Sequence, residues 1–249
     1  MICKNKICQN TRHLRALLCA IAAFALGLAC VPAQTQPVDL ALVLAVDASG
    51  SVNDTRFELQ KRGYAAALRH PQVLRAIRSG PAQAIAVMMV QWTGPHMQAE
   101  TVGWRRITDG ATAEAFAAVV DNAPRQLFSG GTSLSGAIDH AVKLFAGIPY
   151  PWSRRVIDIS GDGVNNRGRP VNDARDEAVA AGIVINGLPI LALDPGLDRY
   201  FERNVIGGPG AFVIAAQSYE TFADAILKKL IIEIAGTGMD GIFLARRAN

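Results

Sequence analysis

From residue 38 onward, short apolar runs alternate with amphipathic stretches of helical periodicity. Continuous or alternating apolar patterns predict strands over residues 40–46, 84–92, 98–104, 155–160, 183–191 and 211–215. Apolar positions spaced by three and four residues predict helices over residues 54–70, 112–122, 134–145, 173–181 and 218–236. Strands that alternate with helices in this way are typical of an α/β protein. Because the pattern shows no internal repeat and no linker, we expect residues 34–249 to form a single domain.

The local sequence also indicates how these strands run. Residues 40–46 are almost continuously aliphatic, which is typical of a parallel strand covered on both faces. Thr93, Gly94 and Pro95 are too few residues for a crossover, so the strand over 98–104 should return antiparallel at an edge of the sheet. Pro71 is expected to break or bend the helix before it. The expected fold is a doubly wound, mostly parallel sheet with one antiparallel edge strand and helices on both faces.

The first 33 residues have the pattern of a secretory signal peptide. A basic segment ends at Arg15, residues 16–31 are apolar, and cleavage after Ala33 would start the mature chain at Gln34. This pattern predicts export to a periplasm or to the extracellular space. Two alternatives remain open: an uncleaved N-terminal membrane anchor, although the run is shorter than the roughly 20 residues of a span, and a lipid at Cys30. Beyond this leader the sequence gives no strong membrane signal.

Composition narrows the choice of partner. The formal charge of +4 comes from four basic residues of the leader, since the rest of the chain has 21 basic and 21 acidic residues. No basic footprint remains for a phosphate backbone, so we expect no nucleic-acid partner. The cysteines also all fall in the leader, and the mature chain is therefore predicted to have no disulfide and no thiolate metal ligand; they are Cys3, Cys8, Cys19 and Cys30.

Three segments place small oxygen-bearing side chains after a predicted strand or before a predicted helix. They are Asp47-Ala48-Ser49-Gly50-Ser51, Gly130-Gly131-Thr132-Ser133 and Ser160-Gly161-Asp162-Gly163. Carboxylates and hydroxyls are ligands that suit a hard divalent cation, whereas Zn²⁺ favours thiolate and imidazole. The sequence therefore predicts a site for Mg²⁺ (or Mn²⁺) whose candidate ligands are Asp47, Ser49, Ser51, Thr132 and Asp162. A D-x-S-x-S segment alone is weak, because such residues are also ordinary turn and N-cap residues.

The runs VDLALVLAVDASGSV, SGGTSLSGAI and RRVIDISGDGVNN resemble a von Willebrand factor A-type (VWA) domain with a metal-ion-dependent adhesion site. More narrowly, the chain resembles a group of exported bacterial A-type proteins of unassigned function. The resemblance covers residues 38–235, and the tail over 237–249 has no interpretation. It implies a six-stranded sheet, metal contacts from Ser49, Ser51 and Thr132, and contacts from Asp47 and Asp162 made directly or through water. It also implies that a partner's carboxylate completes the metal shell.

Two residues near these motifs are unusual. Gly161 stands where many relatives of such domains have Thr or Ser, and Ser160 is the candidate to replace the missing hydroxyl. Asp158 is a charge inside an apolar strand, and we expect it to pair with Arg154 or Arg155, with support of the metal site as the alternative.

The function that these patterns favour is a non-catalytic binding module that recognises an acidic group on a partner protein through the metal. One alternative is a metal-assisted hydrolase of phosphoesters, although no His, Lys or Glu lies near the motifs as a general base. Another is a structural domain whose metal site is unused. The oligomeric state has no signal in the sequence.

Overall fold

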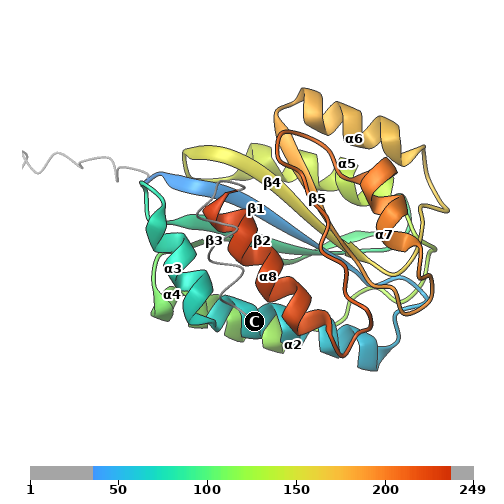
Figure 1. Ribbon diagram of the computed structural model, residues 1–249, viewed down its shortest axis with the longest axis horizontal. Helices are drawn as coiled ribbons and strands as arrows, with labels where there is room; N and C mark the ends of the chain where they lie inside the picture. Colours follow the sequence, from blue (N-terminus) through green and yellow to red (C-terminus); the bar gives the residue numbers. More distant parts are fainter. Residues whose placement is uncertain (1–35, 237–249) are drawn as a thin grey trace, which may run out of the picture. The chain divides into compact units, whose positions relative to one another are not determined.

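The computed structural model describes residues 36–236 and shows a five-stranded sheet at the centre of the fold (Figure 1). The strand order is β3-β2-β1-β4-β5, and only β3 runs antiparallel to its neighbour. The strands are β1 (Val38–Asp47), β2 (Ile85–Trp92), β3 (Gln98–Ile107), β4 (Trp152–Gly161) and β5 (Ile183–Pro189). The predicted mixed sheet with one antiparallel edge strand is confirmed.

Helices cover both faces of the sheet (Figure 1). One face packs against α2 (Asp54–Arg69), α3 (Pro71–Ser79), α4 (Gly110–Asn122) and α8 (Phe222–Ala235). The other face packs against α5 (Leu134–Leu144), α6 (Val171–Ala180) and the short α7 (Leu197–Tyr200). Strand β1 is buried along its whole length, as its aliphatic sequence predicts. In the part of the chain that is described, no helix is long and apolar enough to span a membrane.

The position of β1 determines where a ligand can bind. Strand β1 pairs in parallel with β2 on one side and with β4 on the other, so the order of the strands reverses at β1. In open α/β sheets, the crevice beyond the carboxyl ends of the strands at such a reversal is the usual binding site. The residues that follow β1 and β4 therefore meet at this crevice.

The expected sixth strand is wrong. Residues 211–216 run beside β5 but form only two isolated parallel bridges, Gly187 with Val213 and Ile190 with Ala216. The Gly187 amide and the Pro189 carbonyl both form hydrogen bonds with residues 211–216. Pro189 has no N–H to donate between these two bonds, so the ladder is interrupted there. The sheet therefore has five regular strands and an irregular edge.

The structure adds a second role to Pro71, beyond the expected break. Pro71 does not only end α2, because it is also the first residue of α3, where the fixed φ of proline suits a helix start. The side chain of His70 caps this new helix by accepting a hydrogen bond from the Gln72 amide at 3.3 Å. The predicted leader over 1–33 and the tail over 237–249 lie outside the described residues.

Candidate metal-binding site

Two buried carboxylates lie side by side at the crevice between β1 and β4. Asp47 is the last residue of β1, and Asp162 follows directly after β4. The register pairs Val46 with Ser160, which brings the two aspartates to the same level. The amide of Asp162 donates to Oδ2 of Asp47 at 3.3 Å, so the backbone after β4 holds one carboxylate against the other.

The loop after β1 turns its serine side chains toward these carboxylates. The amide of Ser49 donates to Asp47 Oδ1 at 2.7 Å, which closes the loop. The hydroxyls of Ser49 and Ser51 are 3.2 Å apart, and the Ser51 hydroxyl donates to Asp162 Oδ1 at 2.6 Å. The D-x-S-x-S loop thus supplies three of the five predicted ligands, and the Ser51 hydrogen bond joins Asp162 to them as a fourth.

Thr132 approaches the same crevice from the loop before α5. Gly130 and Gly131 have φ values of +125° and +80°, which a residue with a side chain rarely adopts. The Thr132 amide donates to Asn166 Oδ1 at 3.0 Å, and the Thr132 carbonyl accepts from the Asn166 amide at 2.9 Å. A methyl group at Gly163 would lie only 3.5 Å from the Thr132 hydroxyl. This hydroxyl has no hydrogen-bond partner among residues 36–236, so it is free to bind a ligand.

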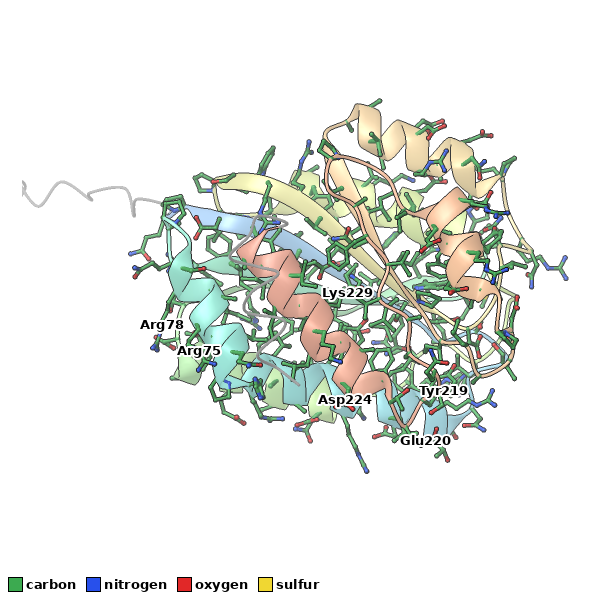
Figure 2. The ribbon with its side chains drawn as sticks, in the orientation of Figure 1. Arg75, Arg78, Tyr219, Glu220, Asp224 and Lys229 are labelled. Atoms are coloured by element: carbon green, nitrogen blue, oxygen red, sulfur yellow. The ribbon has the colours of Figure 1, made fainter. Side chains whose placement is uncertain are left out.

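Two residues that sequence reasoning missed also reach Asp162. Tyr219, in the loop before α8, donates its hydroxyl to Asp162 Oδ2 at 2.8 Å (Figure 2). Arg56, near the start of α2, lies 3.9 Å from the same oxygen and 5.2 Å from the centre of the Tyr219 ring. The guanidinium of Arg56 also donates to the Ser51 carbonyl at 2.7 Å. Nothing in the sequence pattern distinguishes Tyr219 from an ordinary buried aromatic residue.

Gln60 of α2 supports the site through the backbone of Asp47, and the sequence pattern could have identified it as a supporting residue. Its amide donates to the Asp47 carbonyl at 3.1 Å and is fully buried. Gln60 lies on the apolar face of the helix predicted over 54–70, between Phe57 and Tyr64 at spacings of three and four residues. A polar residue in such a buried stripe indicates a specific hydrogen-bond partner.

The electrostatics of the crevice favour a cation. Burial, and next the negative charge of Asp162, raises the pKa of Asp47 to about 7. Within the described residues, the only cation that reaches either carboxylate is Arg56, at 3.9 Å. Burial and the charge of Asp162 also raise the pKa of Tyr219 well above its ordinary value. A divalent cation would neutralise the two carboxylates, and the oxygen-rich donor set fits Mg²⁺.

The donor set also differs from that of a zinc centre. Residues 36–236 contain no group of three or more His, Cys, Asp or Glu side chains placed to hold a metal. The five candidate ligands offer two carboxylates and three hydroxyls, which are hard oxygen donors rather than imidazole or thiolate.

Ser160 does not replace the hydroxyl that Gly161 lacks, so that expectation is wrong. The Ser160 hydroxyl donates to Gln60 Oε1 at 3.4 Å and accepts from the Tyr64 hydroxyl at 3.2 Å. A Cβ at Gly161 would lie 3.2 Å from Asp47 Oδ2 and 3.2 Å from the Trp92 ring. The Trp92 indole therefore occupies the space beside Gly161, and the missing hydroxyl has no substitute at this position.

The expected partner of Asp158 is also wrong. Asp158 forms a fully buried ion pair with Lys229 of α8 at 2.9 Å, and Lys229 also pairs with Glu233. Arg154 and Arg155 instead donate to backbone carbonyls at the C-terminal ends of α8 and α6. Asp158 pairs with Leu44 in the register, three residues before the end of β1, and is not part of the metal crevice.

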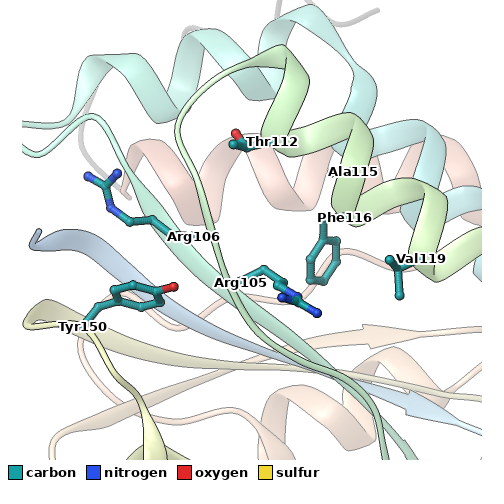
Figure 3. Close-up of a pocket in the computed structure, with 7 residues that line it drawn as sticks. All are labelled: Arg105, Arg106, Thr112, Ala115, Phe116, Val119 and Tyr150. Atoms are coloured by element: carbon teal, nitrogen blue, oxygen red, sulfur yellow. The ribbon is translucent and has the colours of Figure 1, made fainter. Parts of the chain in front are cut away.

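A separate pocket of about 350 Å³ opens beside the edge strand β3 and α4 (Figure 3). It lies beside the end of β3 that pairs with the start of β2, so it belongs to the opposite end of the sheet from the crevice. None of the five candidate ligands contributes to it. Its lining residues are Arg105, Arg106, Thr112, Ala115, Phe116, Val119 and Tyr150.

Comparison with solved structures defines the class of the fold, which is that of a von Willebrand factor A-type domain. A VWA protein from Catenulispora acidiphila matches with a TM-score of 0.52 at 16% identity, over 80% of this chain and 43% of that chain. The residues matched by a family model, 37–238, show more narrowly that the chain belongs to DUF1194, a family described as proteins of unknown function. No curated protein matches the sequence.

Two further solved structures share this fold. Proximal thread matrix protein 1 of the mussel byssus matches with a TM-score of 0.58 at 16% identity, over 80% of this chain and 48% of that chain, and another of its structures has a zinc-occupied MIDAS motif. The pilus adhesin SpaC of Lactobacillus rhamnosus GG matches with a TM-score of 0.56 at 15% identity, over 82% and 31%. This chain thus spans less than half the length of these structures, and identities this low show the fold alone.

Proposed function

We propose that this protein is an exported, non-catalytic binding module that recognises an acidic group on a partner protein through a divalent cation. The residues that would hold the cation are Asp47, Ser49, Ser51, Thr132 and Asp162. The observation that carries the proposal is the crevice itself, where three loops bring three hydroxyl side chains to two buried carboxylates. Mg²⁺ or Mn²⁺ suits these donors, and the metal-occupied MIDAS of the mussel protein supports a divalent ion at this place in the fold.

The charges around the crevice favour an anionic partner. Arg125 lies over the loop after β1 and donates to the Ala48 carbonyl at 3.2 Å. Arg167 is exposed, lies against Gly131, and has no ion-pair partner within residues 36–236. With Arg56, these guanidiniums border the loops that carry the ligand oxygens, although Arg125 is already paired with Asp54 at 2.9 Å. A metal held by these residues would supply a Lewis acid for a carboxylate oxygen, and the arginines would attract the same group.

Two further observations support binding rather than catalysis. Among the described residues, no His, Lys or Glu side chain forms a hydrogen bond with any of the five candidate ligands, so no general base is placed beside them. The structures with a similar fold include a pilus adhesin and a matrix protein of the mussel byssus, and neither name denotes an enzyme. Export follows from the leader over residues 1–33, which supports a periplasmic or extracellular place of action.

The test is retention of the chain on immobilised synthetic peptides. Each peptide carries a fixed central Asp or Glu within otherwise varied positions, and each is paired with the corresponding Asn or Gln peptide. We expect retention on acidic peptides in millimolar Mg²⁺, loss of retention in chelator, and no retention on the amide peptides. Loss of all retention in Asp47→Ala would attribute the effect to the crevice. Retention that is equal in Mg²⁺ and in chelator would contradict the proposal.

A further inference from the structure

Large apolar side chains that are exposed gather at the end of the sheet that carries the crevice. Residues 36–236 contain six such side chains, and four of them lie in loops that follow β2, α4, β4 and β5. Exposed apolar groups that cluster around a polar site are typical of interaction surfaces. We call these four the apolar rim; they are Met97 (39% exposed), Phe128 (60%), Val164 (38%) and Leu193 (54%).

Phe128 contacts the crevice indirectly, through the side chain of Arg125. The guanidinium of Arg125 lies 4.8 Å from the centre of the Phe128 ring and donates to the carbonyls of Ala48 and Ser49. Arg125 also pairs with Asp54 at 2.9 Å, which holds it in place. The most exposed aromatic ring of the described chain is therefore stacked on a fixed group that contacts the loop with the serine ligands.

Met97 and Val164 border the loop that carries Thr132. A Cβ at Gly130 would lie 2.7 Å from the Met97 sulfur, so this thioether packs against the loop two residues before Thr132. Val164 follows Gly163, which is the residue that faces the Thr132 hydroxyl. Both side chains expose more than a third of their surface beside a candidate metal ligand.

Leu193 extends the rim on the side of β5. It lies three residues after Ile190, whose amide donates to the Gly161 carbonyl at 2.9 Å, directly before Asp162. Apolar side chains thus lie in three loops that contact the crevice and in a fourth that begins beside it. The remaining two exposed apolar residues are elsewhere: Val119 lines the pocket beside β3 and α4, and Trp152 is at the start of β4.

Resting on the proposed function, we infer that the partner presents its carboxylate between bulky apolar side chains. The occupant is an extended protein segment in which an Asp or Glu binds at the metal and a Leu, Ile or Phe within about two residues packs on the apolar rim. A partner that offered only a carboxylate and other charges would leave the apolar rim exposed to water. Apolar residues beside the partner's carboxylate would bury the rim. Met97 and Phe128 are side-chain types that suit such adaptable apolar contacts.

The experiment uses the full chain and the peptides with a central Asp, divided into those with apolar residues and those with Ser or Gly within two positions of the Asp. Binding is measured in Mg²⁺ and in chelator, and vesicles of anionic phospholipid form a third arm. We expect at least about tenfold tighter Mg²⁺-dependent binding to the apolar set. Phe128→Ser and Val164→Ser should each remove most of this preference, whereas the matched variant Val119→Ser should keep it.

The outcomes separate this inference from the proposed function. Equal Mg²⁺-dependent binding to both peptide sets would overturn the inference and leave the metal-dependent module intact. Absence of any Mg²⁺-dependent binding would overturn both. Binding to the vesicles without any preference among peptides would assign the rim to a membrane surface and overturn the inference. The Mg²⁺-dependent thermal stability of Phe128→Ser and Val164→Ser should match that of the unaltered chain, which shows that the variants fold and keep the crevice.

Discussion

A buried carboxylate needs either a proton or a cation, and Asp47 illustrates the choice. Its side chain is fully buried, and Asp162 adds a second negative charge whose nearest cation is Arg56 at 3.9 Å. Burial is the larger cause of the raised pKa, and the repulsion from Asp162 is the smaller. Without a metal the crevice therefore destabilises the fold near neutral pH, and a divalent cation would remove that destabilisation.

The first prediction concerns the pH dependence of stability without metal. Because the pKa of Asp47 is about 7 in the folded chain and near 3.8 when unfolded, the folded state binds its proton more tightly. The stability from this group is therefore full below pH 4 and is lost as the pH rises through 7. Asp47→Asn should flatten this loss and be about 1–3 kcal/mol more stable than the unaltered chain at pH 8. Urea denaturation in chelator at pH 5 and pH 8 measures the free energy of unfolding of both chains. The same change in that free energy between the two pH values in Asp47→Asn and in the unaltered chain would contradict the prediction.

The second prediction concerns Arg56, which competes with the metal for Asp162 but attracts the anionic partner. Arg56→Gln should bind Mg²⁺ about threefold more tightly, a modest gain because the guanidinium is partly exposed and screened. The same variant should bind acidic peptides more weakly. Calorimetric titration with Mg²⁺ provides the measurement. Arg62→Gln, an exposed position two turns along α2, is the matched control and should behave like the unaltered chain.

At the scale of elements, the sequence predicts most of the sheet and the site loops, but not how they are arranged. The aliphatic run of β1 and the short turn before β3 are local features, so the sequence alone predicts the structure that they form. The strand order depends on packing between distant segments, and no local pattern contains it. The apolar pattern overestimates the edge beside β5, because Pro189 removes one donor from that segment. The pattern also does not predict α3, because a proline after a helix indicates an end as readily as a new start.

The same distinction applies to the site. The five predicted ligands lie in loops that follow or precede predicted elements, so the motifs were visible in the sequence. Gln60 was visible only as a polar residue in an apolar stripe. Tyr219 and Arg56 approach Asp162 from elements that are distant in sequence, and only the folded chain brings them there.

The third prediction tests the loop that positions Thr132. The Asn166 side chain accepts a hydrogen bond from the Thr132 amide, and Asn166→Ala removes this bond. The backbone bond from the Asn166 amide to the Thr132 carbonyl remains, so the loop should loosen around this ligand but keep its fold. Loss of such supporting contacts typically costs ten- to a hundredfold in metal affinity, and we expect about tenfold weaker Mg²⁺ binding here. Asn165→Ala is the control, since Asn165 bonds to the Ser135 amide and the Arg169 carbonyl but not to Thr132. Equal losses in both variants would show general disorder of the loop instead.

The fourth prediction concerns the ion cluster between α8 and β4. Lys229 lies midway along α8 (Figure 2). It is fully buried and pairs with both Asp158 and Glu233. Lys229→Met would leave these carboxylates without their cation and should cost about 3–5 kcal/mol of stability. The double variant Lys229→Met/Asp158→Leu should regain a substantial part of that loss, since the buried charge goes with its partner. Strictly additive losses in chemical denaturation would show that the pair is not coupled.

At the scale of the whole molecule, one sheet end carries the features that the proposed function needs. The strand order reverses at β1, and the loops beyond β1 and β4 bring the carboxylates together with hydroxyls, arginines and the apolar rim. Outside residues 1–33 the basic and acidic residues balance, so the arginines at the crevice are a local feature rather than part of a general positive charge. Recognition should therefore depend on contacts at this end of the sheet rather than on long-range attraction by the molecule as a whole.

The most direct test of this account is thermal unfolding of the full chain in chelator and in millimolar Mg²⁺ or Mn²⁺. A ligand at a hundred times its Kd stabilises the folded state by about 2.7 kcal/mol, which raises Tm by about 5–10 °C for a chain of this size. We predict this rise for the unaltered chain and for Asp224→Ala, an exposed aspartate on α8 (Figure 2). Asp47→Ala and Asp162→Ala should unfold at the same temperature with and without metal. A Tm that does not respond to either metal, or a response that survives both substitutions, would contradict the metal site.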